Sequence, residues 1–379
     1  MSPTPITFVP MIDFSDLPSE LVVHIIDLVE ASFVDNETFP ISDGRKATLL
    51  RFSRVSRAWR APSQMALHRR VFLQNDAEVN CFLACPIAGR YPTRYLQLTH
   101  VSPTWINLVL DQLVVRDTNR VALHGLKLIE VSEFHTWSLC HPALRDLKSL
   151  QINGHGRSLM GRLPRDLLNL PHLHSLGFGT SIPRDQPGVM ETIISACQKT
   201  LRHIRVDCGL QAEELSPIYP GPGTPSLWAE LDLVAPCLLS VSFQGLSDAL
   251  TKPCKRFLAN CSKLVELELD GTASIEPTLC ALSSDARLRR LAVGQHNRDT
   301  QKDLDPGQAP KTVLRLKGTL PQLSQLRKLD LFEHTRMTVR RLQRSGDMEW
   351  LNDLRREQVD VQFPEPINER TAARSGVKK

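Results

Sequence analysis

The sequence has little that would support catalysis or metal binding. It contains no GxSxG, P-loop, HExxH or GxGxxG motif, and its twelve histidines are scattered along the chain. The nine cysteines are odd in number and form no CxxC pair, which argues against a zinc site and against a disulfide framework. We therefore expect buried free thiols in a reducing compartment, no cofactor, no metal and no catalytic residues.

Long apolar runs and strongly one-sided charge are also missing. No stretch approaches the roughly 18 uncharged apolar residues of a membrane-spanning helix, and Asp13 and Asp16 interrupt the segment where a secretory signal would lie. The net charge is only +5 (46 basic minus 41 acidic residues), and aromatic residues make up only 6% of the chain. These absences predict a cytoplasmic or nuclear protein that binds neither membranes nor nucleic acid.

Leucine is what the chain has in excess, at 56 of 379 residues. In residues 16–30, DLPSELVVHIIDLVE, apolar residues recur three and four apart, which predicts a helix with Pro18 in its first turn. A second helix, ending before Pro62, is predicted from the apolar series Leu49, Phe52, Val55 and Trp59. Four arginines (51, 54, 57 and 60) should form its solvated face, and a third helix should cover about 63–72.

These segments together resemble an F-box, across residues 14–73. The matching residues are Leu17, Pro18, Glu20, Leu21, Ile25, Leu28, Leu50, Val55, Ser56, Trp59, Arg60 and Leu67, and the link after the first helix is longer than the family's usual one. The resemblance implies docking of a Skp-family adaptor, and through it a cullin, by Leu17, Pro18, Leu21, Ile25, Leu28, Leu50, Val55 and Trp59. A partner is also expected on physical grounds, because a unit of about 60 residues buries only about 60% of its surface and is marginally stable alone. The alternative is that these side chains pack against the chain's own next domain.

Behind this module one pattern recurs: a leucine, two residues, an apolar residue, one residue and a second apolar residue. Periods of about 20–29 residues with this pattern are typical of leucine-rich repeats, in which strands and helices alternate. Seven copies begin at Leu147, Leu173, Leu201, Leu238, Leu264, Leu288 and Leu326, and a weaker copy is assigned to Leu126, Ile129 and Val131. The region is similar to the irregular leucine-rich repeats that follow many F-boxes, over residues 120–335.

Strand residues that alternate with the buried ones should face the concave side of such an array. Charged residues gather there at His203, Arg205 and Asp207, at Glu266, Glu268 and Asp270, and at Arg290. Because neighbouring strands lie about 4.8 Å apart, these opposite charges should fall within about 10 Å of one another. We interpret them as a binding surface for a protein target, and the alternative is cross-strand pairing on a solvated sheet.

The predicted fold class is α/β: an N-terminal three-helix F-box followed by an irregular leucine-rich-repeat solenoid, with parallel strands on the concave side and helices on the convex side. The predicted function is that of a non-catalytic substrate receptor in a Skp–cullin–F-box ubiquitin ligase, with an unidentified protein substrate. The alternative is a leucine-rich-repeat binding scaffold with no ubiquitin role. The expected limits are 1–13 (disordered), 14–73 (F-box), 74–119 (connecting segment that can hold degenerate repeats), 120–335 (array), 336–363 (cap helix) and 364–379 (disordered tail).

Overall fold

The structure is a computed structural model of the chain. It describes residues 17–32, 43–86, 91–116, 123–131, 134–153, 159–160, 168, 170–179, 189–207, 227–244, 252–270, 275–294, 308–331 and 349–362. Both terminal segments that were expected to be disordered, 1–13 and 364–379, lie outside these residues.

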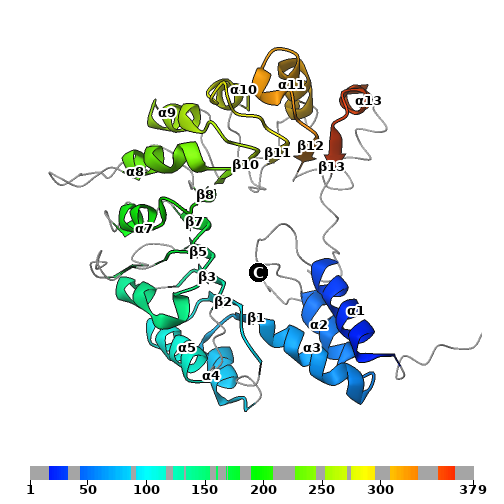
Figure 1. The fold of residues 1–379 in the computed structure, drawn as a ribbon, viewed down its shortest axis with the longest axis vertical. Helices are drawn as coiled ribbons and strands as arrows, with labels where there is room; N and C mark the ends of the chain where they lie inside the picture. The colour runs from blue at the N-terminus through cyan, green and yellow to red at the C-terminus, as the bar shows by residue number, and fades with distance from the viewer. Residues whose placement is uncertain are drawn as a thin grey trace, which may run out of the picture. The chain divides into compact units, whose positions relative to one another are not determined.

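The described residues form an α/β protein built on a parallel sheet (Figure 1). Its eleven strands follow the order β1-β2-β3-β5-β7-β8-β9-β10-β11-β12-β13, and a separate two-stranded sheet pairs β4 with β6. The strands follow one another in chain order, as expected when each strand and the segment after it form one repeating unit. The chain divides into two compact units, Met1–Lys127 and Leu128–Lys379.

The first unit begins with three helices, and α3 packs against both α1 and α2 (Figure 1). Its elements are α1 (Ser19–Ser32), α2 (Asp43–Phe52), α3 (Arg57–Arg69), β1 (Arg70–Leu73), α4 (Asp76–Ala84), β2 (Tyr95–Thr99) and α5 (Pro103–Arg116), while β3 (Gly125–Ile129) spans the boundary. Strands β1 and β2 pair in parallel from Arg70 opposite Tyr95 to Leu73 opposite Leu98.

The prediction of one helix from Leu49 to Arg60 is wrong. The backbone leaves the helix at Ser53, whose hydroxyl donates to the Leu50 carbonyl over 2.8 Å, and α3 starts afresh at Arg57. The amides of Arg54 and Val55 bond carbonyls three residues back, which tightens the chain into a turn. Pro62 therefore lies inside α3 instead of beyond its end, and the predicted third helix gives way to strand β1 from Arg70.

The second unit repeats strand and helix. Its elements are β4 (Phe134–His135), 3-10 helices at Thr136–Cys140 and Pro142–Leu144, β5 (Ser149–Asn153), β6 (Leu159–Met160), β7 (Ser175–Gly179), α7 (Val189–Cys197), β8 (His203–Asp207), α8 (Leu227–Val234), a 3-10 turn at Ala235–Cys237, β9 (Ser240–Gln244), α9 (Lys252–Asn260), β10 (Glu266–Asp270), α10 (Ile275–Cys280), β11 (Arg290–Gly294), α11 (Gln308–Lys317), a 3-10 turn at Pro321–Leu323, β12 (Lys328–Leu331), α13 (Glu349–Arg356) and β13 (Asp360–Gln362). Helices α7 to α11 line one side of strands β7 to β12 (Figure 1).

The leucine pattern accounts for the core of this unit. In all seven copies the three pattern positions are buried, as in Leu264, Leu267 and Leu269 of the β10 copy, each at most 1% exposed. Strands stack in register, so that Val241 of β9, Leu267 of β10 and Leu291 of β11 are direct neighbours. Each strand therefore presents one apolar row to the helices, and burial of that row against adjacent copies holds the array together.

The weak copy assigned to Leu126, Ile129 and Val131 has the wrong register. Leu123, Leu126, Leu128 and Val131 are buried, at 0–3% exposed, whereas Ile129 is only partly buried. The pattern therefore starts three residues earlier than predicted. Successive side chains on strand β3 point to opposite faces, so Leu126 and Leu128 lie on the buried face and Ile129 lies on the other.

Candidate interaction surfaces

The three-helix module has a core and, separately, an exposed apolar surface. Its core consists of Val22, Ile26, Leu49, Trp59 and Ala66, with Leu17, Ile25, Phe52 and Leu67 packed against it. The exposed residues are Leu21 at 48%, Leu28 at 57%, Leu50 at 41% and Val55 at 49%. Among the described residues these are four of the eight large apolar side chains that are exposed. Excess apolar surface is thus concentrated in a short stretch of the chain.

Helix α1 explains this division by its periodicity. Val22 and Ile26 lie four residues apart and face the core, whereas Leu21, Ile25 and Leu28 follow the adjacent stripe at spacings of four and three. Ile25 of this stripe is half-buried, because it also packs against the core. Pro18, which precedes the helix, is also exposed. The outward row on α1, together with Pro18 just before it, thus holds four of the residues expected to contact an adaptor.

Trp59 does not belong to that surface. Its side chain is 3% exposed, and its ring lies 5.2 Å from the Phe52 ring, centroid to centroid. An indole in this position fills the space between the helices and cannot touch a partner unless the core opens. We therefore assign Trp59 to the core of the module and remove it from the predicted contact set. Leu17, which packs against the same core, contributes only part of its surface.

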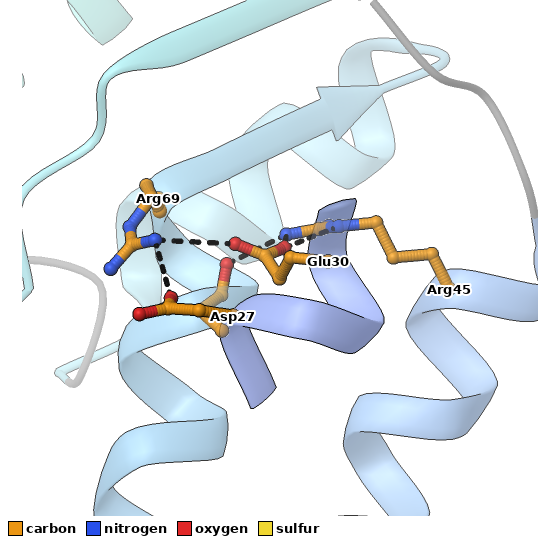
Figure 2. A network of polar contacts seen from close by, with 5 residues as sticks. Asp27, Glu30, Arg45 and Arg69 are labelled. Atoms are coloured by element: carbon orange, nitrogen blue, oxygen red, sulfur yellow. Dashed lines mark hydrogen bonds and ion pairs between the residues drawn. The ribbon is translucent and has the colours of Figure 1, made fainter. Parts of the chain in front are cut away.

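A polar network joins the three helices (Figure 2). Glu30 of α1 accepts hydrogen bonds from the Nε atom of Arg45 at 2.7 Å and from its Nη2 atom, and Nη2 also donates to the Ala66 carbonyl of α3 at 2.8 Å. Arg69 of α3 lies 3.1 Å from a carboxylate oxygen of Asp27 and 3.5 Å from one of Glu30. Arg45 and Glu30 are only 2% and 5% exposed, so this is a buried ion pair with its polar groups satisfied.

The network fixes α1 against α2 and α3 in spite of the long link between the first two helices. Burial lowers the pKa of Arg45, and the neighbouring Glu30 carboxylate opposes that shift. Arg45 is therefore a charge whose position in the core depends on Glu30. Sequence reasoning missed both residues, because an acidic residue in the last turn of α1 and a basic one in α2 look like ordinary surface charges. A long-range partner is visible only once the helices are packed.

In the second unit the predicted charged residues lie in two rows across the strands. The first row runs through Ser175, His203, Ser240, Glu266, Arg290 and Lys328, and the second through Gly177, Arg205, Ser242, Glu268, Ala292 and Asp330. These residues alternate with the buried apolar ones, and we call the face that they form the inner face. The side chains of Asp207 and Asp270 lie outside the described part of the structure, although their backbones continue β8 and β10.

At the β11 end of the inner face the charges neutralise one another. The Nε atom of Arg290 lies 2.6 Å from a carboxylate oxygen of Asp330, and its Nη1 atom lies 3.8 Å from Glu266. Lys328 adds a contact of 3.5 Å to the second oxygen of Asp330, which is 7% exposed. Glu266 and Arg290 are therefore brought together, but as a cross-strand network that the chain completes by itself. Asp330, its central carboxylate, was not among the predicted site residues, although extending the charged row by one strand would have found it.

At the β8 end the charges stay apart. Arg205 stands between Gly177 and Ser242 in the register of the sheet, and Glu268 stands between Ser242 and Ala292. The structure therefore divides the predicted target-binding residues into a neutralised group around Arg290 and a separate group on β8 and β10.

Among the residues that the structure describes, no group of three His, Cys, Asp or Glu side chains is placed to hold a metal ion. Within the same residues, no helix is both long and apolar enough to cross a membrane. The eight cysteines in this part of the chain are free thiols, of which Cys197, Cys254 and Cys261 are buried and Cys237 is partly buried.

Comparison with known proteins adds no family. A scan against models of protein families finds none that matches the chain, and a search of curated proteins finds no relative. The fold therefore defines the class by itself: an α/β protein whose parallel strands and helices are arranged in a solenoid-like manner.

Proposed function

We propose that this chain is a non-catalytic receptor subunit of a Skp–cullin–F-box type ubiquitin ligase. The three-helix module docks a Skp-family adaptor, and the inner face of the second unit holds a protein target. One observation carries the proposal: Leu21, Leu28, Leu50 and Val55 are about half exposed on a small helical module that already has a complete core of its own. The resemblance of residues 14–73 to an F-box supplies the kind of partner.

The energetics favour a partner at this surface. Full burial of a leucine or valine side chain contributes about 1.5–3 kcal/mol, so covering the exposed halves of four of them contributes about 3–6 kcal/mol in all. Association costs at least about 4 kcal/mol in lost freedom, so these four residues form the centre of an interface and need a rim around them. Pro18 and the partly buried Ile25 extend the patch along α1 and supply part of that rim.

The adaptor half of the proposal is tested by binding of the full chain to a purified Skp-family adaptor. Leu21→Asp with Leu28→Asp places two charges on the outward stripe of α1 and should abolish binding. The fold should persist, because both side chains are about half exposed or more. Leu233→Asp is the matched control, since Leu233 is an equally exposed leucine on α8, at 54%. Unchanged binding by the α1 variant, with an unchanged melting curve, would refute adaptor docking at this surface.

The alternative is a binding scaffold that uses the inner face and has no ubiquitin role. The charged and polar inner face supports target binding in both cases. Depletion of the chain distinguishes them. If the chain is a receptor for degradation, its depletion should make the bound protein longer-lived. If it is a scaffold, depletion should leave the turnover of the bound protein unchanged. The Leu21→Asp, Leu28→Asp variant should reproduce the depletion phenotype only if the adaptor is needed.

A further inference from the structure

Two inward-facing arginines of the second unit have opposite surroundings. Arg290 of β11 is flanked by carboxylates and makes ion pairs with Glu266 and Asp330. Arg205 of β8 has Gly177 on one side and Ser242 on the other, so neither adjacent strand offers it a carboxylate at this level. The sheet thus neutralises one guanidinium internally and leaves the other without a counter-charge among the described residues.

The surroundings of Arg205 are also incompletely satisfied. Its Nε atom and the Ser242 hydroxyl oxygen are both buried, and among the described residues neither has a hydrogen-bond partner. Ser242 is 7% exposed, so its unpartnered hydroxyl is more than nine-tenths buried. An unsatisfied buried donor costs about 1–3 kcal/mol of stability, and such groups are uncommon in folded proteins. Arg205 is partly exposed, and the described residues provide no ion pair for its guanidinium.

The strand neighbours of Arg205 are small, and Arg205 as a whole is partly exposed. On the first row Ser175 and Ser240 flank His203, and on the second Gly177 and Ser242 flank Arg205. A Cβ atom at Gly177 would lie 3.0 Å from Cγ of Gln151, which it would crowd, and 3.6 Å from Cβ of Arg205, which is an ordinary contact. Strand β8 thus carries His203 and Arg205 between strands that have only small residues at these levels.

Carboxylates lie two strands away from β8, on β10. Glu268 of β10 is partly exposed between Ser242 and Ala292, and the described residues provide no ion pair for its carboxylate. Glu266, one row along the same strand, lies 3.8 Å from Arg290 and keeps 45% of its side chain exposed. At about 4.8 Å per strand, the Arg205 and Glu268 backbones are about 10 Å apart.

We propose that Arg205 and Glu268 form a two-point recognition site on the inner face for an extended target segment that carries one carboxylate and one ammonium or guanidinium group. The carboxylate binds Arg205, the cation binds Glu268, and the backbone crosses the low strip of Ser240 and Ser242 on β9. Three residues of extended chain span about 10 Å, which matches the separation of the two charges. Charge complementarity selects this occupant, because a purely acidic segment would face Glu266 and Glu268 and a purely basic one would face Arg205. The inference deepens the target-binding half of the proposed function and rests on it.

The test uses fluorescein-labelled peptides of ten serine and threonine residues in which one Glu and one Lys stand two, three or four positions apart. Binding to the full chain is measured by fluorescence polarisation at low salt. Replacing the peptide Glu by Gln should weaken binding to the wild type about three- to fivefold, as for a single partly exposed ion pair. With Arg205→Gln this loss should disappear, and Glu268→Gln should likewise remove the effect of replacing the peptide Lys.

Lys255→Gln on α9 is the matched control, since it removes one exposed charge from the helix side of the same unit and should leave every peptide unaffected. Arg205→Gln should melt at the same temperature as the wild type or higher, because it removes a buried unpaired donor. A clearly lower melting temperature would instead make Arg205 a structural residue and overturn the proposal.

Three other results would overturn it. The first is that none of these peptides binds the wild type at millimolar concentration. The second is that changing the peptide Glu to Gln lowers affinity equally for the wild type and for Arg205→Gln. The third is that a peptide binds only when phosphoserine replaces its Glu. None of these results bears on adaptor docking, which depends on the helical module and is measured separately.

Discussion

At the scale of single residues, the buried Glu30–Arg45 pair should matter more for stability than any other polar contact described in the helical module. Removing one partner leaves the other charged and buried, which costs about 3–5 kcal/mol. We therefore expect Glu30→Gln to unfold or loosen α1, α2 and α3 in the full chain. Hydrogen exchange of peptides from residues 17–69 measures the effect directly, since local opening raises their exchange rates.

A double variant separates charge burial from simple packing. Replacing both residues, as Glu30→Met with Arg45→Met, removes the uncompensated charge and should protect the amides better than either single change does. Asp27→Asn serves as the exposed comparison, because Asp27 and Arg69 keep 49% and 30% of their side chains exposed and their contact is worth at most about 1 kcal/mol. Equal effects of Asp27→Asn and Glu30→Gln would contradict the central role of the buried pair.

Three buried thiols link stability to alkaline pH. Burial raises the pKa values of Cys197, Cys254 and Cys261 to about 12, against an ordinary value of 9.0. The unfolded thiols ionise above pH 9 while the folded ones stay protonated, so the unfolded state binds fewer protons and the free energy of unfolding falls as pH rises from about 9 to 12. Each thiol contributes up to about 1.4 kcal/mol per pH unit in that window.

Replacing the three thiols by alanine isolates their share from that of lysine and tyrosine, which titrate in the same window. Denaturant unfolding at pH 8 and at pH 10 should show a smaller loss of stability for the alanine variant than for the wild type. Cys280→Ala, at an exposed position on α10, should leave the pH dependence as it is. An identical pH dependence of the triple variant and the wild type would contradict the assignment.

At the scale of elements, the turn at Ser53–Ser56 decides which residues are core and which are surface. Val55 in the turn is 49% exposed, whereas Trp59, four residues later in α3, is 3% exposed. Trp59→Ala should therefore cost about 3–5 kcal/mol and unfold the module, because it empties the space between the helices. Val55→Asp should leave the melting curve within about 0.5 kcal/mol of the wild type and weaken adaptor binding.

Circular dichroism of the full chain and an adaptor pull-down together distinguish these outcomes. If Trp59→Ala folds normally but no longer binds the adaptor, the indole belongs to the contact surface, and its assignment to the core is wrong. Phe52→Leu is a milder comparison, since it alters the ring that Trp59 contacts but keeps an apolar side chain there.

The same turn shows where sequence reasoning about elements succeeds and fails. Apolar spacing places Leu49 and Trp59 on one helical stripe, and both are buried, although Trp59 was predicted to contact an adaptor. It cannot reveal the interruption between them, because Leu49, Phe52, Val55 and Trp59 have helical spacing whether or not the helix is continuous. In the array, by contrast, a strand of four or five residues lies in each of the seven copies, and the alternation that predicts it also fixes its buried face. Long-range charge partners such as Glu30 and Arg45 depend on packing, so spacing alone does not identify them.

At the scale of the whole molecule, the second unit is a series of similar strand-and-helix steps, each stabilised mainly by its neighbours. Its last step is different: α13 and β13 follow β12 in the described sheet, and β13 pairs Asp360 with Lys328 and Gln362 with Asp330. Trp350, Leu354 and Val359 are 0–3% exposed, and Lys317 of α11 lies 2.9 Å from a carboxylate oxygen of Glu357. This segment therefore covers apolar surface and sheet edge that β12 would otherwise present.

Trp350→Ala combined with Leu354→Ala should loosen that cover, at about 2–5 kcal/mol for each side chain. Because each step depends chiefly on the adjacent one, amide protection measured by hydrogen exchange should fall most at β12, less at β11 and β10, and least at β7 and β8. Exposed strand edges pair with other chains, so the variant should also aggregate at lower concentration than the wild type. Arg356→Ala, an exposed change on the same helix, should leave both properties unchanged. A uniform loss of protection from β5 to β12 would instead mean that the array unfolds as one cooperative body, in which the terminal step has no special covering role.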